Sequence, residues 1–119
     1  MAVFRVRASL KLVREDKLFG PGVARLLEGV DELGTLRRSA ARMQMSYNKA
    51  WSVMHRCEEQ LGFALLARQI GGAGGGGAVL TDKGRALLER YRAFDREAHT
   101  WLDARAREYF ADLLEEGEV

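Results

Sequence analysis

One segment limits the possible folds more than any other: residues 70–81 read IGGAGGGGAVLT, and six of these twelve residues are glycine. Such a run could be a slack linker, a phosphate-binding loop or the tip of a β-hairpin. Gly72, Gly74 and Gly77 match G-x-G-x-x-G, but a dinucleotide loop opens into a helix, and here the short β-like segment AVLT follows. No Lys-Ser or Lys-Thr follows, which argues against a P-loop. A linker would leave ALLARQI and AVL unpaired, whereas a hairpin pairs them.

Periodicity predicts a mainly helical chain around this hairpin. Apolar and polar residues alternate over residues 4–12, which is typical of a strand with one buried face. The spacing of apolar residues predicts four helices, over residues 23–33, 36–42, 47–61 and 82–114. Three of these helices are preceded by residues that favour N-caps, Thr35, Ser46 and Thr81. Two are followed by a glycine, Gly34 or Gly62.

This order of elements is the outline of a winged helix-turn-helix. We therefore expect a mainly α fold with a small β-hairpin, an N-terminal strand and a long C-terminal dimerisation helix. A chain of 119 residues is long enough for one domain. The expected parts of that domain are the helix-turn-helix at residues 35–62, the wing at 64–81 and the long helix at 82–114.

The helix over residues 47–61 is the candidate DNA-reading helix. At about 100° per residue, Ala50, Met54 and Cys57 share an apolar arc, and the opposite arc is polar. In this motif the first turns of the second helix enter the major groove, where Asn and Arg read base edges. The DNA-binding candidates are Ser46, Tyr47, Asn48, Lys49, Ser52 and Arg56, with Arg37 and Arg68 as further basic candidates. Any amphipathic surface helix also has a polar arc, so the interpretation depends on the neighbouring elements.

The charge distribution favours a polyanionic partner more than the net charge of +2 does. Residues 35–85 contain eight Lys or Arg and three Asp or Glu, a difference of five positive charges. A phosphate backbone attracts such a segment. A solvated charged face is the competing interpretation.

No pattern of residues supports catalysis or a metal site. His55 and His99 lack ligand spacing, and no nucleophile stands near a His and an acid. The single cysteine, Cys57, excludes an intramolecular disulfide. We therefore expect no enzyme activity, no cofactor and no metal. The absence of a signal peptide and of an apolar run near the ~18 residues of a membrane span indicates a cytoplasmic protein without a membrane partner.

The long helix carries aromatic residues farther than a domain of this size can bury. Roughly thirty helical residues span about 45 Å, and aromatic residues spaced three and four apart usually face another helix. We expect a dimerisation surface made by Tyr91, Phe94, Trp101 and Tyr109. Packing against the N-terminal strand of the same chain is the alternative, and both can hold.

Three motifs resemble the N-terminal DNA-binding domain of the ModE family of molybdate-responsive transcriptional regulators and, more distantly, the LysR-type helix-turn-helix. They are KLF at residues 17–19, SYNKAW at 46–51 and GGAGGGGAVLT at 71–81. The resemblance covers nearly the whole chain. It implies a winged helix-turn-helix that dimerises through its terminal segments and binds operators of molybdate-uptake or molybdenum-enzyme genes. It maps the recognition helix onto residues 46–61 and the wing onto residues 65–80.

Two departures from this family affect the expected function. The family often has a basic residue in the glycine run, where this chain has Ala73, so wing contact would rest on Arg68 and backbone N–H groups. Full-length members carry C-terminal molybdate-binding domains, and because this chain ends at Val119 we expect a single-domain member that does not bind molybdate directly. The expected function is sequence-specific regulation, with double-stranded DNA bound at near-palindromic operators by a homodimer. The alternative is a protein-interaction module that heterodimerises with a full-length regulator.

Overall fold

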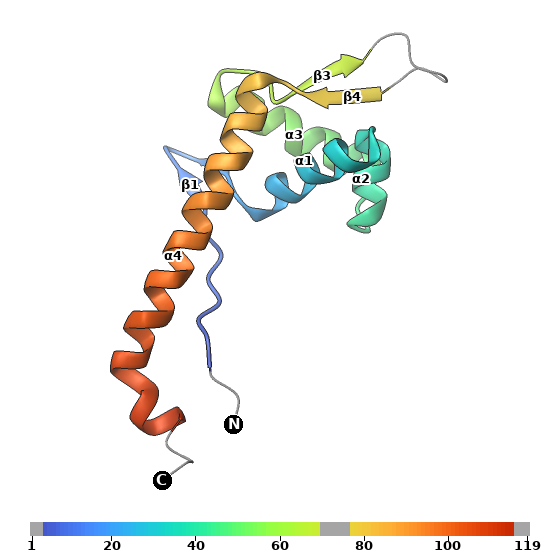
Figure 1. Cartoon of the computed structure of the whole chain (residues 1–119). Coiled ribbons are helices and arrows are strands. Elements are labelled where there is room, and N and C mark those ends of the chain that lie inside the picture. Colours follow the sequence, from blue (N-terminus) through green and yellow to red (C-terminus); the bar gives the residue numbers. More distant parts are fainter. Residues whose placement is uncertain (1–3, 70–76, 116–119) are drawn as a thin grey trace.

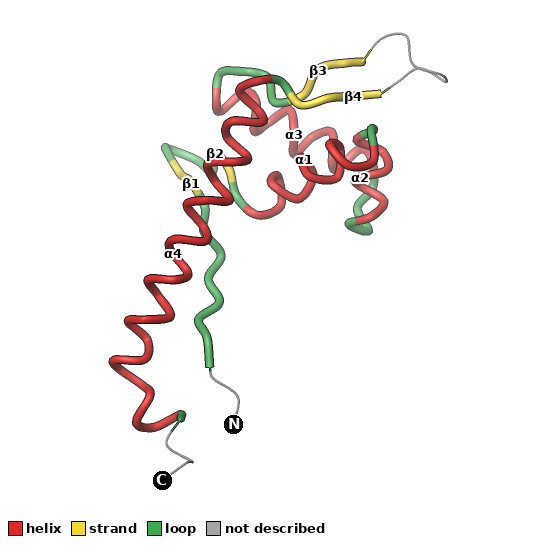
Figure 2. The backbone as a smooth tube through the Cα atoms, in the orientation of Figure 1, coloured by secondary structure: helices red, strands yellow, loops and turns green. Residues whose placement is uncertain are grey.

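The computed structural model describes residues 4–69 and 77–115 and shows a helical head on a long helical stalk (Figure 1). The molecule measures 64 × 31 × 23 Å. Its elements, in chain order, are β1 (Leu12–Val13), β2 (Lys17–Phe19), α1 (Pro21–Leu33), α2 (Leu36–Arg42), α3 (Tyr47–Leu61), β3 (Leu66–Gln69), β4 (Gly77–Leu80) and α4 (Asp82–Leu114). The chain is mainly helical with small antiparallel hairpins, as the sequence predicts (Figure 2).

Local capping fixes where the helices begin and end. The side chains of Thr35, Ser46 and Thr81 each accept a hydrogen bond from the backbone N–H three residues further on, at 3.0, 3.1 and 2.9 Å. Gly34 and Gly62 end α1 and α3 with φ angles of 88° and 85°, in the left-handed region that favours glycine. The predicted caps are confirmed, and α1 begins two residues earlier than predicted, at a proline suited to a first helical turn.

The core lies where α1, α2 and α3 meet the wing and the first turns of α4. Its largest fully buried apolar side chains are Phe19, Leu26, Leu27, Met54, Leu65, Leu88 and Val30. Helices α1 and α2 are in close contact at Gly29, where a Cβ atom would lie 2.6 Å from the Cβ of Ser39 and closer still to its hydroxyl oxygen. That buried hydroxyl donates a hydrogen bond of 2.8 Å to the carbonyl oxygen of Leu26. The space between the two helices at this point is therefore too small for a side chain at position 29.

Strands β3 and β4 form the predicted hairpin, which favours a wing over a linker. They pair antiparallel, with Leu66 opposite Leu80 and Gln69 opposite Gly77. The tip at residues 70–76, which contains Ala73 and most of the glycine run, lies outside the described residues.

The predicted N-terminal strand is wrong over residues 4–11, which we call the arm. These residues are extended, and their burial alternates as the sequence predicts, but they pair with no strand among the residues described. The strand that follows is only Leu12–Val13, which pairs with Lys17–Phe19. The arm instead runs alongside α4 (Figure 1), and the residues of its less exposed face are half-buried.

Three hydrogen bonds hold the arm on α4. The N–H of Val6 donates to Asp103 Oδ1 at 2.7 Å, the N–H of Ala8 donates to His99 Nε2 at 3.1 Å, and the Tyr91 hydroxyl donates to the carbonyl oxygen of Leu10 at 2.8 Å. The arm therefore satisfies backbone groups through side chains of a helix, where a strand would use a neighbouring strand.

Only the first part of α4 packs on the head. A helix of 33 residues is about 50 Å long, and its buried residues near the head include Leu88 and Tyr91. Two exposed ion pairs, Arg85 with Asp31 at 2.8 Å and Arg92 with Glu28 at 2.6 Å, join it to α1. The hydrogen bond from Arg85 lowers the pKa of the Asp31 carboxyl below its usual value. The remaining length of α4 forms the stalk.

Candidate nucleic-acid interface

Helix α3 has one buried face and one exposed face, as the helical wheel predicts. Ala50, Met54 and Cys57 lie in the core, whereas Asn48, Lys49, Ser52 and Arg56 are exposed. The apolar face packs in the core against α1 and α2, so the polar face is turned to solvent. The structure thus presents a row of hydrogen-bonding side chains along one surface of the head.

Cys57 is a core residue of α3. Its thiol donates a hydrogen bond of 2.8 Å to the carbonyl oxygen of Leu18 on β2. Burial raises the pKa of the Cys57 thiol to about 11. The side chain therefore stays protonated at neutral pH and contributes packing to the reading helix.

The start of α3 is shaped by a cap and by an arginine stacked on an aromatic ring. The Ser46 hydroxyl oxygen accepts from the N–H of Lys49 at 3.1 Å, so part of its hydrogen-bonding capacity is used inside the helix. The guanidinium of Arg37 on α2 lies 4.3 Å from the centroid of the Tyr47 ring, which is half-buried beneath it. This contact holds Arg37 at the junction of α2 and α3, with its charge on the surface.

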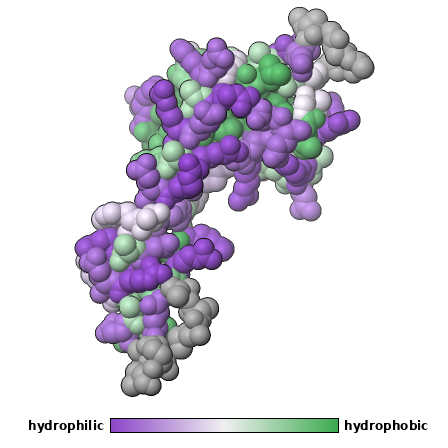
Figure 3. Space-filling view, in the orientation of Figure 1, coloured by the Kyte–Doolittle hydropathy of each residue, from purple (hydrophilic) through white to green (hydrophobic). Residues whose placement is uncertain are grey.

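A groove of about 580 Å³ runs between α2, α3 and the wing, and we call it the reading groove. Its lining residues are Thr35, Leu36, Arg37, Arg38, Tyr47, Trp51, His55, Leu66, Ala67, Arg68, Gly77 and Ala78. Among the described residues that line it are three arginines and no carboxylate, so this lining carries a net positive charge. Much of the visible surface of the head is polar (Figure 3).

Trp51 and His55 line this groove, and neither is among the DNA-binding residues that the sequence predicts. Their rings stack with centroids 3.7 Å apart, and 46% of the Trp51 side chain is exposed. Tyr47, Trp51 and His55 are spaced four residues apart, which places them on one stripe of α3. That spacing is the signal that could have found them, because an aromatic stripe beside a polar arc borders the reading face.

The wing is fixed to the head at its root. The Glu58 carboxylate accepts hydrogen bonds from the backbone N–H groups of Leu65 at 2.7 Å and Leu66 at 3.2 Å. The N–H of Ala78 on β4 donates to the carbonyl oxygen of Gly34 at 2.9 Å. These bonds set the wing beside the reading groove, and Arg68, opposite Ala78 in the hairpin, lies exposed at its edge.

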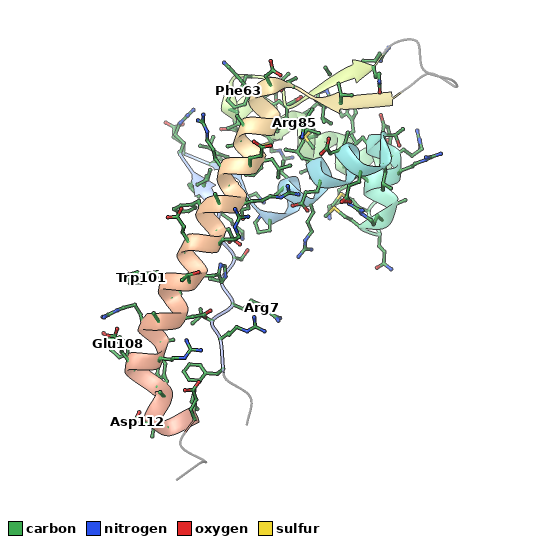
Figure 4. All side chains as sticks on the ribbon, in the orientation of Figure 1. Arg7, Phe63, Arg85, Trp101, Glu108 and Asp112 are labelled. Atoms are coloured by element: carbon green, nitrogen blue, oxygen red, sulfur yellow. The ribbon has the colours of Figure 1, made fainter. Side chains whose placement is uncertain are left out.

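The stalk carries an exposed aromatic surface. Phe94, Trp101 and Tyr109 are exposed to 54%, 62% and 64%. The Arg105 guanidinium lies 5.7 Å from the Trp101 ring and 5.6 Å from the Tyr109 ring, which joins them in one stripe. Trp101 lies on the side of α4 opposite the arm that carries Arg7 (Figure 4). We call Phe94, Trp101, Arg105 and Tyr109 the stalk stripe.

Tyr91 differs from the other residues expected at a dimer surface. Only 7% of its side chain is exposed, and its ring packs edge-on against Phe19 at a centroid distance of 5.1 Å. Its hydroxyl donates to the arm at Leu10. Tyr91 is therefore a core residue of its own chain, and its expected place on a dimer surface is corrected.

Residues 4–69 and 77–115 contain no group of three or more His, Cys, Asp or Glu side chains placed to hold a metal ion. Within the same ranges, the helices are too short or too polar to cross a lipid bilayer.

Comparison with known proteins places this architecture in a family. The model of bacterial regulatory helix-turn-helix proteins of the lysR family matches residues 23–85, from α1 through the wing to the first turn of α4. The molybdenum transport protein ModE of Azotobacter vinelandii is 37% identical over 79 residues, which cover 66% of this chain and 29% of that protein. The DNA-binding transcriptional dual regulator ModE of Escherichia coli K12 is 35% identical over 83 residues, which cover 69% of this chain and 32% of that protein.

A solved structure shares the fold. The structure described as the crystal structure of a CbnR_DBD–DNA complex aligns with a TM-score of 0.57 and 27% identity, over 74% of this chain and 94% of that chain. The resemblance to ModE and LysR-type proteins is confirmed, although the chain spans less than a third of the length of these two ModE proteins. The protein belongs to the lysR family of bacterial regulatory helix-turn-helix proteins.

Proposed function

We propose that the chain is a DNA-binding transcriptional regulator that reads the major groove with α3. The observation that carries the proposal is the exposed row of Asn48, Ser52 and Arg56 on a helix whose opposite face is buried. Asn pairs with adenine and Arg with guanine through two hydrogen bonds each, and Ser accepts several partners. Family membership and the DNA complex of the structural relative support the same function.

The basic residues around α3 would hold the DNA backbone. Arg37 on α2 and Arg68 on the wing are exposed in the reading groove, and Lys49 is exposed in the first turn of α3. Phosphate contacts of this kind position a protein on the duplex, and base contacts then supply specificity. Ser46 and Tyr47 stand at the same end of α3, where a backbone phosphate approaches the helix N-terminus in this motif.

Binding measurements on a DNA fragment recovered from a genome-wide binding map test these roles. Asn48→Ala and Arg56→Ala each remove a base-reading side chain and are expected to weaken specific binding by roughly 1–3 kcal/mol. Arg68→Ala removes a phosphate contact, so binding to all sequences weakens and the salt slope falls by about one. Arg107→Ala, on the far half of α4, is the control with unchanged affinity. A folded Asn48→Ala/Arg56→Ala protein that binds its operator normally, or binding that is insensitive to salt, would contradict the proposal.

We further infer that the chain acts as a homodimer joined through the stalk stripe. Exposed aromatic residues at intervals of seven and eight residues recur on one side of α4 about every two turns. Burial of such rings stabilises helix pairs, and a two-fold dimer would present two copies of α3 to successive major grooves. Near-palindromic operators follow from that symmetry.

Sedimentation equilibrium tests the dimer. Trp101→Ala is expected to raise the dimer dissociation constant by about tenfold or more, because a central tryptophan is often an interface hot spot. Val13→Ala, an equally exposed apolar residue on β1 (63% exposed), is the matched control. A wild-type chain that stays monomeric at about 0.1 mM, or equal dissociation constants for the two variants, would exclude this surface.

The regulated genes are proposed from the named relatives. Two ModE proteins match the region that includes the reading helix at 35–37% identity, so we propose operators beside molybdate-uptake or molybdenum-enzyme genes. A genome-wide binding map with and without molybdate tests this assignment. The chain itself is expected not to bind molybdate, so its affinity for a purified operator should be the same with and without the ion. Binding sites confined to unrelated promoters would refute the molybdenum assignment and leave DNA binding intact.

A further inference from the structure

A second groove, remote from the reading helix, lies between the arm, α1 and α4. Its volume is about 670 Å³, within the range of small-molecule sites. Three segments far apart in the sequence build it, at residues 7–9, 21–28 and 91–99. Figure 4 shows Arg7 on the arm, beside the stalk. We call this space the arm groove.

The arm groove has an excess of positive charge. Four arginines line it, Arg7, Arg25, Arg92 and Arg96, against two carboxylates, Glu28 and Asp95. Arg92 is paired with Glu28 at 2.6 Å. Asp95 lies 3.4 Å from His99. Across residues 4–69 and 77–115, no acidic partner lies within 4.0 Å of Arg7, Arg25 or Arg96.

His99 adds no positive charge in this arrangement. A backbone N–H can only donate, so the 3.1 Å bond from the N–H of Ala8 requires His99 Nε2 to accept. The ring proton then sits on Nδ1, which donates to the carbonyl oxygen of Asp95 at 2.9 Å. The lining therefore carries a surplus of two positive charges, and a dianion would neutralise it.

The three uncommitted arginines come from different parts of the groove lining. Arg7, Arg25 and Arg96 are exposed and stand on three different elements, and the lining also contains Pro21, Ala24 and Tyr91. Guanidinium groups bind carboxylates through paired hydrogen bonds, and the apolar wall suits a short carbon chain. Helix α1 also begins here without a capping side chain, which adds partial positive charge.

We propose that the arm groove binds a small organic dianion with two separated carboxylates. The site needs neither DNA nor the stalk stripe, so its test is independent of the proposed function. A bound dicarboxylate links the arm to α1 and α4, and α1 in turn packs on α2 and α3.

The test is a ¹⁵N NMR titration of the full chain with sodium succinate, at ionic strength held constant with sodium chloride. Saturable shifts are expected at Ala8, Ser9 and Ala24, and not at Ser52 on α3. Arg25→Gln and Arg96→Gln each remove one charge-assisted contact and should raise the dissociation constant about tenfold or more. Arg90→Gln, an exposed arginine of α4 outside the groove, should leave it unchanged.

Sodium molybdate is the comparison ligand, since it has the same charge in one compact group. Binding of succinate with no binding of molybdate supports a site for separated carboxylates. Equal binding of both ions, no saturable shift with succinate up to about 20 mM, or equal effects of Arg25→Gln and Arg90→Gln would each overturn the proposal.

Discussion

The contact between α1 and α2 makes a sharp prediction for Gly29→Ala. The new methyl group would lie 2.6 Å from Ser39 Cβ and 3.1 Å from its Cα. Rotation of the Ser39 side chain moves the hydroxyl and leaves both of these atoms in place, so the two helices must separate. Overpacking of this kind costs about 3 kcal/mol at the upper end of its usual range. Alanine recovers about 1 kcal/mol of helix propensity, so we expect a net loss of about 2 kcal/mol.

Urea and thermal denaturation of the purified variant measure this loss. For a domain of this size, 2 kcal/mol corresponds to a fall in Tm of roughly 8 °C. Gly22→Ala in the same helix is the control, because no atom lies within 4 Å of its added Cβ, and it should be neutral or slightly stabilising. Ser39→Gly in the Gly29→Ala background removes the opposing Cβ. The double variant should therefore be at least about 1 kcal/mol more stable than the sum of the two single-variant losses predicts. Strictly additive effects, or a Gly29→Ala protein as stable as Gly22→Ala, would refute the steric argument.

Three further variants test the arm, the thiol and the turn. Tyr91→Phe leaves the Leu10 carbonyl without its donor, so stability should fall by about 1 kcal/mol and hydrogen exchange of arm amides should accelerate; unchanged exchange would contradict the arm contact. The pKa of Cys57 is about 11 in the folded chain against 9.0 for an unperturbed thiol. The unfolded thiol therefore ionises first, so the stabilisation that Cys57 contributes should be present below pH 9 and be lost between pH 9 and 11. A Cys57→Ala protein that loses the same stability in that window would exclude the thiol as the source. Gln44, between α2 and α3, has a φ of 57°, in the left-handed region. In urea denaturation, Gln44→Val should lower the free energy of unfolding by about 1 kcal/mol and Gln44→Gly should not. Equal losses for the two variants would argue against the left-handed backbone.

The helices of the head were predictable because their signals are local. Thr35 and Ser46 cap the starts of α2 and α3, and Gly34 and Gly62 end α1 and α3. The start of α1, which has no capping side chain, was placed two residues too late. The hairpin followed from the same reasoning, since Thr81 had to cap α4 and the segments beside the glycine run needed partners.

The partner of the arm was not predictable, because alternation of apolar and polar residues indicates that one face is covered but not which element covers it. Residues 4–11 keep that alternation, yet their backbone bonds go to Tyr91, His99 and Asp103, about ninety positions away in the sequence. The same limit applies to the reading groove. The polar arc of α3 was evident from spacing alone. The hydrogen bonds from the wing to the Glu58 carboxylate, in contrast, depend on a turn geometry that only the folded chain defines.

Because the stalk is long, a small rotation at its base moves its far end a large distance. Helix α4 leaves the head at Tyr91 and continues for 23 residues to Leu114, which is about 35 Å. A rotation of only about 10° where Tyr91 meets Phe19 would therefore carry the far end of the helix through about 6 Å. In a dimer held together along the stalks, the same rotation would change the separation of the two copies of α3. In such a dimer, the packing of Tyr91 on Phe19 would therefore influence the spacing of the half-sites that the protein can span.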